Sequence, residues 1–160
     1  MGPERLPERL RSELRGRRVV VLCLGSEIRG DDAAGLRVCD HLAQRGLSEL
    51  VIRAGPVPEA FIPELRERRA EVVLIVDAVE AGLPPGSIVL AEPPFREGFR
   101  PTSTHGLPLD LLVLLLKEEI PNAQILLLGI QVSQTNVGSE LSAEVDLSAS
   151  LVADLINQAL

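Results

Sequence analysis

The sequence predicts an α/β protein: a three-layer α/β/α sandwich on a twisted, five-stranded mixed sheet with one antiparallel strand. Three observations predict it. Apolar, β-branched runs alternate with amphipathic helical segments from Arg18 onward, 160 residues suit a single domain, and no repeat or linker divides the chain. We therefore expect one domain over residues 18–160, preceded by a polar N-terminal extension over residues 1–17 with few apolar side chains to bury.

Apolar runs mark the candidate strands. RVVVLCL and VVLIVDA are nearly continuous aliphatic runs, which is typical of strands covered by helices on both faces. Only VEAGLPPG separates the third strand from the fourth, and a parallel crossover needs about a dozen residues or more. We therefore expect the fourth strand to be antiparallel. The candidate strands are residues 18–24, 49–54, 72–78, 86–92 and 124–132.

Helical periodicity fills the intervals. The first helix is expected over residues 32–45, with Ala34, Val38, Cys39 and Leu42 on its inner face. A second runs through Leu65 to about Arg69. A third, over residues 107–119, is apolar on most sides and is expected to be well buried. The C-terminal helix is expected to turn one group of side chains inward: Leu147, Leu151, Leu155 and Ile156.

Two cysteines, Cys23 in the first strand and Cys39 in the first helix, do not form a disulfide framework by their number or spacing. We expect both to be small buried apolar side chains. Cys23 is then too buried to act as a nucleophile.

Composition excludes several classes of protein. A net charge of −7 disfavours a phosphate backbone as partner, and three phenylalanines without tyrosine or tryptophan give no stacking platform for single strands. The N-terminus has no apolar core of a signal peptide, and the longest apolar run, Leu111–Leu116, is far too short to span a bilayer. We expect a cytoplasmic protein with no nucleic-acid partner and no membrane insertion.

Acidic residues follow the strands where such sheets bind ligands. The turn GSEIRGDDAAG places Asp31 and Asp32 just after the first strand, Asp77 ends the third, and His105 lies in the loop STHGLP. Because ligands bind beyond the carboxyl ends of the strands, these side chains are expected to converge. Two carboxylates and an imidazole form a divalent transition-metal site, which suits nickel, zinc, iron or manganese better than calcium.

Each of these residues also has an ordinary structural explanation. One of the paired acids, Asp31 rather than Asp32, is expected to cap the first helix. Asp77 could be a strand-end turn residue and His105 an unremarkable loop residue. The other histidine, His41, is expected on the polar surface of the first helix.

Other templates fail on specific residues. The glycine turn has neither the Lys-Ser/Thr of a P-loop nor the G-x-G-x-x-G of a dinucleotide site, and Ser26 is not in a G-x-S-x-G elbow. A phospho-receiver domain also carries acids after its first and third strands. It needs a lysine after its fifth strand, however, where this chain has LLLGIQVSQ.

From Arg18 to the C-terminus the chain resembles the nickel–iron hydrogenase maturation endopeptidases, most closely the formate-hydrogenlyase-type branch. The matching segments occur in the family's order and spacing: LGSEIRGDDAAG, GPVPE, LIVDAVEAGLPPG, STHGLPLDLL and LLLGIQ. Ser26, Glu27 and Val132 depart from the residues usual in the family.

The resemblance implies a function and a set of site residues. Members remove a short C-terminal extension from the hydrogenase large-subunit precursor once nickel has been inserted, and the metal-contacting positions correspond to Asp32, Asp77 and His105. We expect these three residues to engage the precursor's nickel and to be the catalytic ones, with Asp32 as a candidate general base. The alternative from another class is a non-catalytic chaperone that checks the nickel-loaded large subunit.

Overall fold

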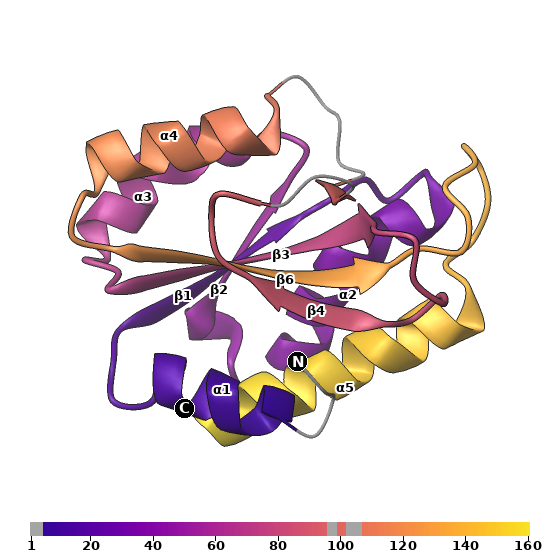
Figure 1. Ribbon diagram of the computed structural model, residues 1–160, viewed down its shortest axis with the longest axis horizontal. Coiled ribbons are helices and arrows are strands. Elements are labelled where there is room, and N and C mark those ends of the chain that lie inside the picture. The colour runs from indigo at the N-terminus through magenta and orange to yellow at the C-terminus, as the bar shows by residue number, and fades with distance from the viewer. Residues whose placement is uncertain (1–4, 96–98, 102–106) are drawn as a thin grey trace.

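A computed structural model describes residues 5–95, 99–101 and 107–160 (Figure 1). The strands are β1 (Val19–Leu24), β2 (Val51–Gly55), β3 (Val72–Glu80), β4 (Ile88–Ala91), β5 (Arg100–Pro101) and β6 (Gln124–Gln131). The α-helices are α1 (Leu6–Leu14), α2 (Ala34–Gln44), α3 (Ile62–Glu67), α4 (Leu109–Glu119) and α5 (Ala143–Ala159). Short 3₁₀ helices are η2 (Gly30–Ala33), η3 (Ser48–Leu50) and η4 (Pro58–Phe61).

The main sheet has the order β2-β1-β3-β6-β4. β2, β1, β3 and β6 run parallel, and β4 is antiparallel to β6, as the short connection before it predicts. The expected five-stranded mixed sheet is confirmed. In addition, the two-residue strand β5 pairs antiparallel with the end of β3, and it lies outside the five strands expected from the sequence.

Helices cover both faces of the sheet, which confirms the three layers (Figure 1). One buried cluster joins the sheet to α1, α2 and α5, and a second joins its other face to α3 and α4. β1 is buried at every position and β3 at all but its last, because parallel strands between two helical layers have no solvent face. The sheet is therefore a rigid frame for residues at its carboxyl edge.

The N-terminal extension contributes more to the hydrophobic core than expected. It folds as α1, and its Leu10 and Leu14 are fully buried in the cluster shared with α5. The two leucines are four positions apart and so lie on one helical face, which a surrounding run of charged residues hides in the sequence. The division of the chain after residue 17 stays a prediction.

The inward face of α5 differs from the expected one. Leu147 is 74% exposed and Leu151 is 51% exposed, whereas Ile156 is buried as expected. The buried stripe consists of smaller or β-branched side chains: Val145, Ala149, Val152, Ala153, Ile156 and Ala159. α5 carries two apolar stripes, and small side chains let it pack closely against both α1 and α2.

Two further expectations need correction. α4 is not buried on most sides, because Leu111 and Leu114 are 44% and 62% exposed. Cys23 and Cys39 are buried as expected, but a disulfide joins them and ties β1 to α2. The bridge leaves no nucleophilic thiol. Among the described helices none is long and apolar enough to cross a membrane.

Candidate functional site

The carboxyl edge of the sheet brings together two of the predicted site residues. Asp32 lies in η2, which follows β1 after the turn of residues 25–29, and Asp77 lies near the end of β3. Both side chains are fully buried, and η2 contacts β3. His105, the third predicted residue, lies outside the described residues.

Close backbone packing sets the position of Asp32. Gly25 has a φ of +139°, and a Cβ there would overlap the backbone oxygen of Asp32. The Ser26 N–H donates to that same oxygen at 3.1 Å. The turn after β1 therefore folds back onto η2 and holds Asp32 at the edge of the sheet.

Gly35 allows the first turn of α2 to rest on two strand ends. A Cβ at this position would overlap the backbone oxygens of Leu24 in β1 and Val76 in β3. Val76 directly precedes Asp77. The absence of a side chain at Gly35 therefore lets the segment that carries Asp32 lie against the strand that carries Asp77.

Replacing Gly35 with alanine should lower the free energy of unfolding by about 2–3 kcal/mol, because the two carbonyl oxygens belong to rigid strands and cannot move aside. Urea denaturation measures the change. Gly46→Ala is the matched control: its φ is +79° and a Cβ there meets nothing within 4 Å, so only the left-handed backbone cost of about 1 kcal/mol is expected. Equal losses in the two variants would contradict the packing role of Gly35.

Asp31 does not cap the first helix, contrary to the sequence-based expectation. It is fully buried, and its Oδ2 accepts the backbone N–H groups of Ser133 at 2.7 Å and Gln134 at 3.0 Å. Ser142 donates its N–H to Oδ1 at 2.7 Å and its hydroxyl to Oδ2 at 2.9 Å. Asp31 thus fastens the loop of residues 133–142 to the turn beside Asp32.

Backbone hydrogen bonds strengthen this attachment. The Asp31 N–H donates to the Gln134 carbonyl at 2.7 Å, and Gly30 N–H donates to the Ser139 carbonyl at 3.2 Å. The Gly138 N–H donates in return to Ile28 at 2.7 Å. The loop and the turn therefore form one hydrogen-bonded unit around η2.

Asp77 occupies a defined row of the sheet. It is paired with Gly129 of β6, and its Oδ1 accepts the Ala78 N–H at 2.8 Å. By the alternation of strand side chains it shares the face of Val73 and Ile75, which α3 and α4 cover. The Asp77 carboxylate is thus positioned by strand β3, whereas the Asp32 carboxylate is positioned by the turn after β1 and η2.

The donor set of these two carboxylates suits a divalent cation. Within residues 5–95, 99–101 and 107–160, no three histidine, cysteine, aspartate or glutamate side chains cluster as a metal site. The described residues therefore place two of the three expected ligands, Asp32 and Asp77, at one edge of the sheet, and metal binding by these two and by His105 stays a prediction.

Gln131 is a site-edge residue that sequence reasoning did not single out. It is 2% exposed, and its Oε1 accepts the N–H groups of Ala81 at 2.8 Å and Leu83 at 3.3 Å. Its Nε2 donates to Glu80 at 2.9 Å, and the pKa of the Glu80 carboxyl is lowered by the Gly82 N–H and then by Gln131. In the sequence, the polar amide at the end of the apolar run LLLGIQ is the feature that could have identified this residue.

Comparison with known proteins gives a consistent result. The family model described as HycI, hydrogenase maturation protease, matches residues 36–159. The hydrogenase 3 maturation protease of Escherichia coli K12 is 38% identical over 113 residues, which is 70% of this chain and 71% of the relative. A putative hydrogenase maturation protease of Methanocaldococcus jannaschii is 32% identical over 124 residues, 72% of each chain.

Solved structures agree with the sequence relatives. The crystal structure of the [NiFe] hydrogenase maturation protease HycI from Thermococcus kodakarensis has a TM-score of 0.78 and 28% identity, covering 93% of this chain and 99% of that one. The solution structure of the endopeptidase HycI from Escherichia coli has a TM-score of 0.71 and 30% identity, covering 87% and 89%. The predicted resemblance is confirmed: the chain belongs to the HycI family of hydrogenase maturation proteases.

Proposed function

We propose that this protein removes the C-terminal extension of a nickel–iron hydrogenase large-subunit precursor in the cytoplasm, after nickel has been inserted. Family membership supports peptide-bond hydrolysis in hydrogenase maturation. The observation that carries the proposal for the site is the pair of fully buried carboxylates, Asp32 and Asp77, held at one edge of the sheet by separate elements.

The substrate's own nickel is the recognition element in this proposal. Asp32, Asp77 and His105 engage it when the precursor docks, with Asp77 and His105 as its ligands and Asp32 beside them, and a precursor without nickel lacks the group that these residues recognise. Bound nickel polarises the scissile carbonyl or lowers the pKa of a water molecule. Asp32 accepts the proton of the attacking water as general base, while Asp77 on the rigid β3 frame fixes the position of the metal-bearing segment.

The test is the mass of the precursor with time, measured for the nickel-loaded and the metal-free forms from the same source. Loss of one defined C-terminal peptide from the nickel-loaded form alone is the expected result. An unchanged mass together with a stable complex would overturn the proposal in favour of a checking chaperone. Equal cleavage of both forms would overturn the nickel requirement alone.

A further inference from the structure

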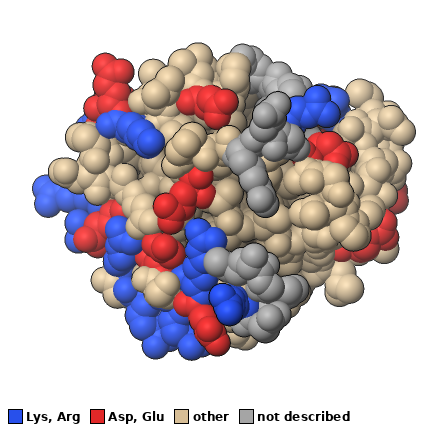
Figure 2. Space-filling model, viewed as in Figure 1, with Lys and Arg blue, Asp and Glu red and all other residues tan. Residues whose placement is uncertain are grey.

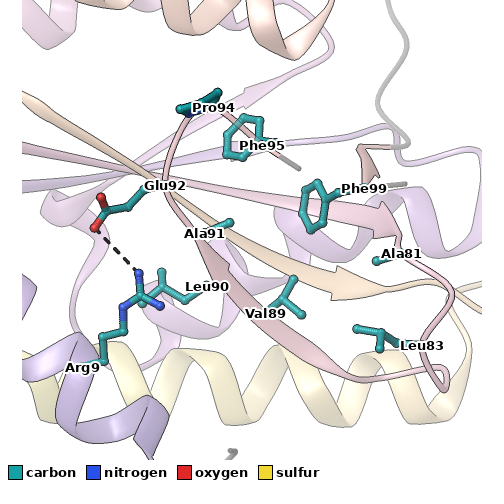
Figure 3. Close-up of a pocket in the computed structure, with 10 residues that line it drawn as sticks. All are labelled: Arg9, Ala81, Leu83, Val89, Leu90, Ala91, Glu92, Pro94, Phe95 and Phe99. Carbon is teal, nitrogen blue, oxygen red and sulfur yellow. Dashed lines mark ion pairs between the residues drawn. The ribbon is translucent and has the colours of Figure 1, made fainter. Parts of the chain in front are cut away.

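A groove of about 580 Å³ runs along the outer edge of β4, away from the buried carboxylates (Figure 3). Phe95 and Phe99 form its upper wall with their ring centroids 5.8 Å apart, and Arg9 reaches up from α1 toward Glu92 at 3.7 Å. Its lining is otherwise apolar: Ala81, Leu83, Val89, Leu90, Ala91 and Pro94.

The floor of the groove offers backbone hydrogen-bonding groups. Among the described strands, β4 pairs with β6 alone and so forms an edge of the sheet. The Gln131 N–H donates to the Ser87 carbonyl at 2.8 Å, which fixes the alternation of the antiparallel ladder. In that alternation Val89 and Ala91 exchange hydrogen bonds with β6, and Ile88 and Leu90 turn their N–H and C=O groups outward.

The groove and the candidate site share one face of the sheet. Asp77, Gly129 and Val89 are paired in a single row across β3, β6 and β4, so their side-chain positions point to the same face. At about 4.8 Å per strand, a strand added outside β4 would lie roughly 14 Å from Asp77. About four extended residues span that distance.

The end of the groove nearest the candidate site is held in place by the buried side chain of Gln131. Ala81 and Leu83 line it, and both donate their N–H groups to the buried Gln131. β4 starts at this end, because Ile88 is paired with Ile130 near the carboxyl edge and Ala91 with Leu127 farther in. A chain that leaves the site along the groove therefore runs parallel to β4, toward α1.

Charge favours a non-basic occupant. Residues 5–18 hold six arginines and two glutamates, in a chain with a net charge of −7. Figure 2 shows a concentration of basic side chains, with acidic ones among them, in the part of the surface where α1 lies, and Arg9 of α1 lines the groove. A segment that passes α1 gains from negative charge and is repelled if it carries lysine or arginine.

We propose that the groove binds part of the client's C-terminal extension as an additional strand parallel to β4. This inference rests on the proposed function, because the polypeptide that binds in the groove is the hydrogenase precursor. The bound stretch begins about four residues beyond the scissile bond, is apolar at alternate positions and lacks positive charge. Hydrogen bonds to Ile88 and Leu90 hold its backbone, and the walls around Phe95 and Phe99 receive its side chains.

Leu90→Pro and Leu90→Ala test the added strand as a matched pair. Both remove the leucine side chain, but only proline removes the outward N–H, and proline is compatible with an edge position of this kind. We expect the KM for the nickel-loaded precursor to be at least about 10-fold higher for Leu90→Pro than for Leu90→Ala, since a lost backbone hydrogen bond and a blocked edge weaken binding. Thermal unfolding of both variants checks that they fold.

Amide hydrogen exchange of the wild-type protein with and without the precursor gives a second readout that does not depend on cleavage. Slower exchange at Ile88 and Leu90 is expected. Equal KM values for the two Leu90 variants, or unchanged exchange at both amides in the complex, would overturn the groove proposal. An intact precursor after incubation with wild-type protein would instead overturn the proposed function, and the exchange measurement would still decide whether the groove binds.

Discussion

Asp77→Asn is expected to slow removal of the extension by at least about 100-fold while the protein stays folded. Asparagine matches aspartate in shape and retains an oxygen for the Ala78 N–H, which the Asp77 carboxylate accepts at 2.8 Å. It lacks the negative charge that binds a cation. The rate is followed by mass spectrometry of the nickel-loaded precursor, and circular dichroism on heating checks the fold.

Asp110→Asn is the matched control for Asp77→Asn. Asp110 is an exposed carboxylate in the first turn of α4, so its replacement removes the same charge without touching the buried edge. Its rate should stay within about twofold of wild type, because exposed charges interact weakly through water. Normal processing by Asp77→Asn would show that the Asp77 carboxylate is not part of the active site.

Asp31→Ala is expected to have the largest effect on stability, a loss of about 3 kcal/mol in the free energy of unfolding. Three backbone N–H groups, those of Ser133, Gln134 and Ser142, lose their acceptor together. A donor left without a partner costs about 1–3 kcal/mol where it is buried and less where water reaches it. Urea denaturation measures the loss, and processing should fall with it because η2 carries Asp32.

Asp40→Asn gives the comparison for a surface carboxylate. Asp40 accepts the Arg53 guanidinium at 3.1 Å, with its side chain 40% exposed, so its removal should cost less than about 1 kcal/mol. If Asp31→Ala and Asp40→Asn had similar small costs, the attachment of the loop through Asp31 would not stabilise the protein.

The sheet and its edge were predictable from local patterns. β1 and β3 are buried on both faces, so their sequences are nearly continuous aliphatic runs that are easy to identify. The short connection before β4 is compatible only with an antiparallel strand. The rule that ligands bind beyond strand ends then selects Asp32 and Asp77. Asp77 ends the apolar run of its strand, and Asp32 follows its strand after a short glycine-containing turn.

Long-range packing explains what could not be predicted. The role of Asp31 depends on Ser133, Gln134 and Ser142, which lie in a polar loop without periodicity. The inward face of α5 depends on how closely α1 and α2 approach it, so the stripe with Leu147 looks as suitable as the one with Val152. Sequence periodicity identifies a helix with two apolar stripes but not which stripe its neighbours cover.

The attachment of Asp31 has a consequence for the timing of synthesis. Its partners lie 102 to 111 positions later in the chain, so a ribosome has translated Asp31 and Asp32 long before it adds the loop that fastens them. Contacts this far apart in sequence form late and slowly. The nascent chain therefore carries Asp31 and Asp32 without the loop that fastens them, and the turn after β1 is held in place only once residues 133–142 have been added and have folded onto it.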